Sequence, residues 1–234
     1  MKECTVSASA GDPQRGPSPL TLSVIYLLLF AGGVIAATRL AGGATYVSPF
    51  AGDAAILDFF RKHADAVRVQ GFVVLASSIP LGFYAVTVSN RLNILGIRTA
   101  GTKIALFGGL GASFILALSG MAQWILSQQS IAMDDSATLS WQNFAFITGG
   151  PGYASLLGLM IGGITIPSYL LRLLPRWVCL WGIALGFIGQ LSLLSLLQPQ
   201  ASYLIPLTRF LGFIWLIVSS ALLPRATRVC KQLA

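Results

Sequence analysis

The side chains best suited to holding a ligand are an arginine and two glutamines that lie within otherwise apolar runs. Arg209, Gln123 and Gln190 each interrupt a stretch with few or no other charged residues. Polar groups inside a bilayer are costly unless they face a partner, a cavity or water. A guanidinium matches carboxylate, phosphate and carbonyl oxygens. We therefore predict a polar cavity with Arg209 as its cationic centre.

A glycine- and proline-rich sequence interrupts the uncharged run 144–171, at Gly149, Gly150, Pro151 and Gly152. Proline removes a backbone donor, and each helical glycine costs about 1 kcal/mol. Within a bilayer, loosened backbone persists only where protein or a wet cavity satisfies it. We expect the three glycines to border the cavity. The alternative is a kinked or late helix start, because a straight helix over this run would be about 42 Å long.

Arg39, at the end of the first apolar run, completes the set of candidate binding residues. Each candidate also has an interpretation without a ligand. Arg209 is close enough to the interface to reach lipid headgroups, and the glutamines are typical of hydrogen bonds between spans. The sequence leaves these alternatives open.

Catalytic signatures are absent from the sequence. It has no glycine-rich phosphate loop, serine-nucleophile elbow or HExxH motif, and its single histidine is His63. A haem or zinc site built on one histidine would need other ligands that the neighbouring sequence does not offer. We predict no catalytic residues, metal or cofactor, and we regard an enzyme as the least favoured class.

Composition indicates the framework that must position these residues. The chain has 234 residues, of which 55% are hydrophobic and 9% charged; soluble domains carry about 25% charged residues. Runs of about 20 apolar residues span a bilayer as helices. We predict an all-α bundle of six spans within 20–225, a disordered tail at 1–19 and a second tail at 226–234. The expected spans are 20–40, 69–88, 104–126, 144–171, 177–197 and 203–223.

The polar segment between the first two spans carries an amphipathic pattern over 54–68. Ile56, Phe60 and Val67 share one face, and Asp58 and Lys62 are spaced for an ion pair on the other side. This pattern favours a helix that lies on the membrane or covers the bundle. A solvated extension of the second span is the alternative.

Basic residues indicate the orientation. They are scattered singly, which does not fit nucleic-acid binding, and they favour one side of the expected bundle. With the N-terminus inside, the inner segments hold Lys2, Arg15, Arg91, Arg98, Lys103, Arg172, Arg176, Arg225, Arg228 and Lys231, and the outer segments hold Arg39, Arg61, Lys62 and Arg68. We predict a multi-pass inner-membrane protein with both termini cytoplasmic. Cys4, Cys179 and Cys230 then lie on the cytoplasmic side as reduced thiols.

The run 20–40 is longer than the apolar region of a signal peptide, about 7–15 residues, so we expect it to be retained as a span. Cleavage is the alternative.

Small-residue pairs such as Gly158 with Gly162 and Gly182 with Gly186 predict close helix packing. We favour packing within the chain over a homo-oligomer interface.

Three segments carry a resemblance to known proteins: 48–68, beginning Ser-Pro-Phe-Ala-Gly-Asp; 77–82, Ser-Ser-Ile-Pro-Leu-Gly; and 149–152. Over 20–225 the chain resembles uncharacterised bacterial six-helix integral membrane proteins. The resemblance implies a bacterial inner membrane and no activity.

Two functions remain. The first is a structural or accessory membrane protein, with the lipid bilayer, a further copy or another membrane protein as partner. The second is the binding or transport of a small, anionic ligand through an outward-facing polar pocket.

Overall fold

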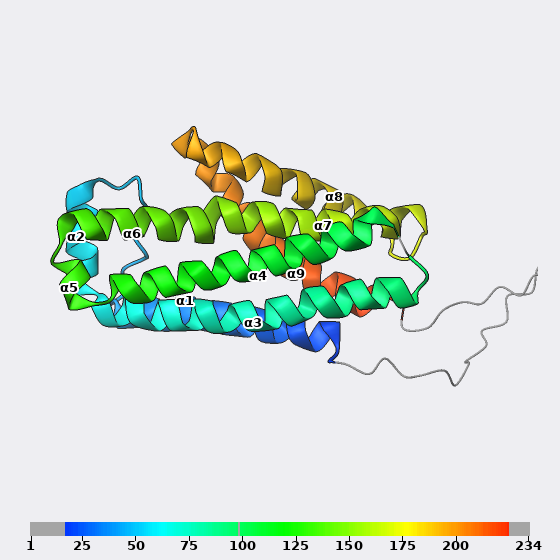
Figure 1. Ribbon diagram of the computed structural model, residues 1–234, viewed down its shortest axis with the longest axis horizontal. Coiled ribbons are helices and arrows are strands. Elements are labelled where there is room, and N and C mark those ends of the chain that lie inside the picture. The colour runs from blue at the N-terminus through cyan, green and yellow to red at the C-terminus, as the bar shows by residue number, and fades with distance from the viewer. Residues whose placement is uncertain (1–16, 98, 225–234) are drawn as a thin grey trace, which may run out of the picture.

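The structure, a computed structural model, describes residues 17–97 and 99–224 (Figure 1). All regular structure in this part of the chain is helical, and 6 helical segments are long and apolar enough to cross a membrane. The prediction of an all-α bundle with six spans is confirmed. The segments are Pro19–Leu40, Ala64–Ile94, Ala100–Leu126, Asp135–Leu170, Arg176–Leu196 and Pro199–Leu222.

The long helices run up and down along one axis (Figure 1). They are α1 (Pro19–Leu40), α3 (Ala64–Ile94), α4 (Ala100–Leu126), α6 (Asp135–Ile147) continued by α7 (Tyr153–Leu170), α8 (Arg176–Leu191) and α9 (Leu204–Leu222). Short 3₁₀ helices follow α8 at Ser192–Leu196 (η2) and precede α9 at Pro199–Tyr203 (η3). The start of α1 and the end of α9 lie at one end of the bundle, which we call the terminal end. The short helices α2 (Asp53–Lys62) and α5 (Gln129–Ala132) lie at the other, the α2 end.

The fourth span is longer than its apolar run indicated. It begins at Asp135 because Asp134 caps α6, its carboxylate accepting a hydrogen bond from the backbone N–H of Ala137 at 3.0 Å. The glycine-proline sequence does not break the rod. Residues Thr148–Gly152 form a π-helical turn, η1, that joins α6 to α7. A π turn is wider than an α turn and is typical of functional sites.

The amphipathic segment 54–68 is divided by the structure into two helices. His63 has non-helical dihedral angles of φ −119° and ψ 33°, so α2 ends at Lys62 and α3 begins at Ala64. Figure 1 shows α2 lying across the end of the bundle. It buries Ile56 and Phe60 in a cluster with Val67 and neighbouring apolar residues of α4 and α6. Helix α2 thus covers the end of the bundle, and residues 64–68 extend the second span as the start of α3.

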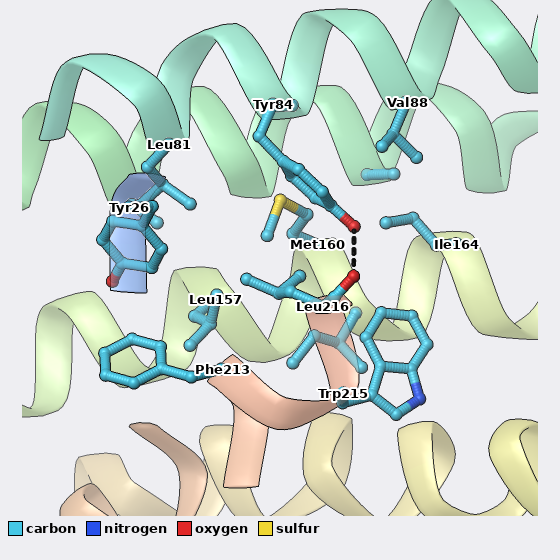
Figure 2. Close-up of a cluster of buried hydrophobic side chains, with 14 of the residues drawn as sticks. Tyr26, Leu81, Tyr84, Val88, Leu157, Met160, Ile164, Phe213, Trp215 and Leu216 are labelled. Carbon is cyan, nitrogen blue, oxygen red and sulfur yellow. Dashed lines mark hydrogen bonds between the residues drawn. The ribbon is translucent and has the colours of Figure 1, made fainter. Parts of the chain in front are cut away.

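The main core lies where α3, α7 and α9 meet, around large rings (Figure 2). The indole of Trp215 donates to the carbonyl oxygen of Val178 at 2.9 Å, and the Tyr84 hydroxyl to that of Leu216 at 3.5 Å. Both polar tips are thereby satisfied in an apolar setting. Around this core, side chains such as Phe107 and Phe187, each 66% exposed, form an outer apolar surface. Such a surface is what a bilayer requires, so the molecule is a multi-pass membrane protein.

Small residues allow the long helices to approach closely. A Cβ atom on Gly163 of α7 would lie 2.7 Å from the carbonyl oxygen of Gly101 on α4, and one on Gly158 would lie 3.0 Å from that of Gly186 on α8. Only glycine fits at such contacts. A Cβ on Gly162, in contrast, would have no neighbour within 4 Å. These contacts are made within the chain.

Candidate functional site

A cavity of about 530 Å³ lies in the α2 half of the bundle, between α1, α3, α4, α6 and α9. Its volume falls within the range of about 300–1,000 Å³ that is usual for small-molecule sites. Its walls are mainly apolar, with Phe30, Val67, Val74, Leu116, Ile205 and Phe210 among the lining residues. The polar contribution comes from a few side chains and from the π-helical turn.

Arg209 is the cation of this cavity. It lies five residues into α9, about 8 Å along the helix from Leu204. Its Nη2 donates a hydrogen bond to the carbonyl oxygen of Gly149 in η1. Its guanidinium carbon lies 5.2 Å from the ring centroid of Phe30 and 4.9 Å from that of Tyr153. Two aromatic faces at this distance attract a cation and hold its plane in place.

No carboxylate of the described residues forms an ion pair with Arg209. The ion pairs within residues 17–97 and 99–224 join Arg61 to Asp135, Lys62 to Asp58 and Arg68 to Asp65. All three are exposed pairs at the α2 end, and none includes Arg209. Moreover, Nε of Arg209 is buried and has no hydrogen-bond partner. A buried donor without an acceptor costs about 1–3 kcal/mol, so this N–H is free to donate a hydrogen bond to a ligand oxygen.

Next to the π turn, the wall of the cavity is formed by α4. Ser119 donates to the carbonyl oxygen of Ala145 at 3.0 Å, and Nε2 of Gln123 donates to Oγ of Ser119 at 3.3 Å. Oε1 of Gln123 is buried without a partner. A Cβ on Gly149 would collide with Oγ of Ser119. Glycine at this position therefore lets the turn approach α4.

A short segment closes the α2 end of the cavity. We call residues 41–52, which join α1 to α2, the strap. The Tyr46 hydroxyl donates to Oε1 of Gln142 at 3.0 Å, and Nε2 of Gln142 donates to the carbonyl oxygen of Val47 at 3.2 Å. Gln142 is 2% exposed. The ring of Phe50 packs edge-on against Phe146 at 5.4 Å between centroids. The strap is thus fastened to α6 over the cavity.

Of the candidate residues that the sequence indicated, Arg209, Gln123, Gly149 and Gly150 line the cavity, whereas Arg39, Gln190 and Gly152 do not. Nε2 of Gln190 donates to the backbone carbonyl oxygen of Ser155 at 2.8 Å, and its Oε1 accepts from the Ser155 hydroxyl at 3.1 Å. Gln190 therefore joins α7 to α8 by hydrogen bonds between spans, which was the alternative to ligand binding that the sequence left open for the glutamines. Arg39 is exposed at the end of α1.

Sequence reasoning missed several residues that form the site. Phe30 and Tyr153 hold the guanidinium, yet one aromatic residue in an apolar run looks like any other. Gln142 fell in a segment expected to be a loop. Asp134, a good helix cap before a run of helix-compatible residues, was the feature that could have placed Gln142 on a helix.

The described residues offer neither a metal site nor a cysteine pair. No group of three or more histidine, cysteine, aspartate or glutamate side chains there could hold a metal ion. Cys179 is buried, with its thiol 3.8 Å from the carbonyl oxygen of Leu174, and Cys4 and Cys230 lie outside the described residues. Comparison of the sequence with protein-family models, with curated proteins and with solved structures finds no match.

Proposed function

We propose that this membrane protein binds a small molecule through an anionic or carbonyl group in the cavity around Arg209. The observation that carries the proposal is the guanidinium itself. It lines a cavity of ligand size, has no carboxylate partner within the described residues, and leaves Nε without an acceptor. A charge taken out of water is stabilised by an opposite charge or by good acceptors. A bound anion would supply both.

The arrangement also fits binding better than a purely structural role. A structural arginine in a bundle is normally satisfied by its neighbours, as Gln190 is by Ser155. At Arg209 the chain provides two aromatic faces and one carbonyl oxygen, and Nε remains without an acceptor. A few polar groups in a mainly apolar cavity are typical of a ligand site, and an acceptor on the ligand would complete the N–H of Arg209.

We further propose that the α2 end faces the outside of a bacterial inner membrane. The acidic residues of the described part lie at this end, at Asp53, Asp58, Asp65, Asp134 and Asp135. Apart from Arg209, the basic residues of the described part divide evenly, with Arg91, Lys103, Arg172 and Arg176 at the terminal end and Arg39, Arg61, Lys62 and Arg68 at the α2 end. The cytoplasmic excess of basic residues therefore rests on the sequence at Lys2, Arg15, Arg98, Arg225, Arg228 and Lys231. The bacterial assignment is supported by the resemblance of the three segments named above. The cavity then opens in the outer half of the membrane.

A thermal-shift experiment tests the proposed function. The protein, purified in a neutral maltoside detergent, is heated with acetate, benzoate, inorganic phosphate, decanoate and decyl phosphate, each at matched ionic strength. A ligand present at 100 times its Kd stabilises the native state by about 2.7 kcal/mol. We expect at least one anion to raise the Tm of the wild type but not that of Arg209→Gln.

Arg39→Gln is the matched control, because this arginine lies on α1 near the cavity without lining it. It should respond to the anions as the wild type does. If no anion raises the Tm of the wild type, or if Arg209→Gln responds equally, the proposed function is wrong and the accessory role takes its place.

A further inference from the structure

The cavity has a side that faces the bilayer. Six of its lining residues are themselves exposed. Thr45, Tyr46 and Ser48 belong to the strap, and the other three belong to the spans: Val34 on α1 (37%), Phe210 on α9 (55%), and Pro206, one turn before Phe210. Exposed lining residues on two neighbouring spans mark an opening towards the bilayer. These residues belong to two membrane-spanning helices, so this opening lies between α1 and α9 and is bordered by apolar side chains.

The opposite route, from water at the α2 end, is crossed by the strap, which is exposed to its surroundings at Thr45, Tyr46 and Ser48. The strap contributes Thr45 to Pro49 to the lining, and its hydrogen bonds to Gln142 hold it there. Tyr46 also packs against Phe59 and Phe60 of the helix that crosses the bundle, at 5.8 and 5.9 Å between centroids. Entry from water requires this held strap to move, whereas entry between α1 and α9 does not involve it.

The walls divide the cavity chemically. Around Arg209 lie the π turn, Ser119 and Gln123, all polar at the atoms they present. The opening is bordered by the apolar side chains of Val34, Pro206 and Phe210. A ligand that satisfies both parts has an acceptor at one end and a hydrocarbon chain at the other.

We propose that the ligand is a single-chain anionic amphiphile, with a carboxylate or phosphate head, that reaches Arg209 from the outer leaflet through the gap between α1 and α9. This inference rests on the proposed function and names its ligand class. The head accepts hydrogen bonds from Arg209, including Nε, and the chain lies along Phe30 and Val34 and leaves between the two helices. The remaining acyl chain stays in lipid, so the cavity holds only the head and the first part of the chain.

The test compares head and chain separately, at fixed free concentrations in the aqueous phase. The probes are acetate and inorganic phosphate (head only), octanoate, decanoate and decyl phosphate (head and chain), and methyl decanoate (chain without charge). We expect apparent affinity, from Tm against concentration, to rise with chain length by up to about fourfold for each methylene that the cavity buries. The neutral ester and the two head-only anions should give no shift. The two decyl probes distinguish a carboxylate from a phosphate head.

Two variants test the route. Val34→Trp narrows the opening, and Ile35→Trp is its control, because Ile35 is adjacent, 54% exposed and not part of the lining. We expect Val34→Trp to weaken decanoate binding at least tenfold and Ile35→Trp to leave it unchanged. Because Val34→Trp does not touch Arg209, it also keeps the inference testable if Arg209→Gln fails to fold.

Each contrary result has its own meaning. If acetate or phosphate stabilises as strongly as decanoate in an Arg209-dependent way, the acyl-chain inference falls and the proposed function stands. Equal shifts with decanoate and its methyl ester overturn the anionic head. Equal binding by Val34→Trp and Ile35→Trp overturns the route between α1 and α9. If no probe binds, the inference and the proposed function fall together.

Discussion

Arg209 of α9 donates a hydrogen bond to the carbonyl oxygen of Gly149, in the π turn of the fourth span. The bond joins two spans across the cavity and satisfies a backbone oxygen at a place where helical hydrogen bonding changes its spacing. Hydrogen bonds that involve a charged group contribute about 1.5–3 kcal/mol. We therefore expect Arg209→Ala to lower the free energy of unfolding by about 2 kcal/mol, measured by denaturant unfolding in detergent. Arg39→Ala should change it by less than about 0.5 kcal/mol; equal losses would mean that the bond contributes nothing.

Two adjacent glycines of α7 should respond in opposite ways to the same change. A Cβ on Gly163 would lie 2.7 Å from the carbonyl oxygen of Gly101, whereas one on Gly162 would have no neighbour within 4 Å. We expect Gly163→Ala to destabilise the protein by about 1–3 kcal/mol, because α4 and α7 must separate. Gly162→Ala should be neutral or stabilise by up to about 1 kcal/mol, through helix propensity. Thermal unfolding of the pair checks this, and a tolerated Gly163→Ala would contradict the packing.

The strap should loosen when its anchor on α6 is removed. Gln142→Leu keeps the approximate size of the side chain but loses the hydrogen bonds to Tyr46 and Val47. At about 1 kcal/mol each, their loss makes strap opening roughly thirtyfold more frequent. Hydrogen–deuterium exchange of residues 44–52, followed by mass spectrometry, measures that change. Gln129→Leu, at an exposed position, is the control, and unchanged exchange in Gln142→Leu would show that the strap is held by other contacts.

The cap of α6 gives a pH dependence. The backbone N–H of Ala137, followed by the hydroxyl of Ser136, holds the pKa of Asp134 below its ordinary value of 3.8. A carboxylate with a lowered pKa stabilises the fold above its ordinary pKa, and this contribution is lost as the pH falls through the lowered value. Asp134→Asn keeps a capping oxygen that does not titrate. We expect the wild type to have the higher Tm at pH 7 and the difference to shrink as the pH falls below 3.8 and through the lowered pKa of Asp134; a constant difference would contradict the assignment.

The spans were predictable because a bilayer demands long uncharged helices, and hydropathy records that demand directly. The residues at which the spans begin and end were less predictable. The break at His63 lies in a segment whose helical pattern runs on without interruption to Arg68, and only the packing of Ile56 and Phe60 across the bundle explains it. The early start of the fourth span depended on a cap, which hydropathy does not register.

The site was predictable in part for a similar reason. A charged residue such as Arg209 can be found in an apolar run by inspection, but the face of the helix on which a residue lies cannot. Gln190 and Gln123 look equivalent in the sequence, yet one joins two helices and the other lines the cavity. In a helix that is apolar all round, no periodic pattern reveals its rotation. The contact between Tyr46 and Gln142, separated by 96 positions, has no local pattern at all.

The π turn at Thr148–Gly152 is, in effect, one extra residue within a helix. Each residue turns an α-helix by about 100°. The wider π turn absorbs the extra residue, because five residues of it turn the chain about as far as four residues of an α-helix. If the same residues were wound as a regular α-helix instead, α6 would rotate relative to α7 by roughly the 100° of one residue. Gln142 would then leave the strap while Gly163 stayed against α4. The width of this turn thus sets the phase between the half of the rod that closes the cavity and the half that packs the core. An alignment with a chain that lacks the extra residue must place its gap here, or it misassigns every face on one side of the turn.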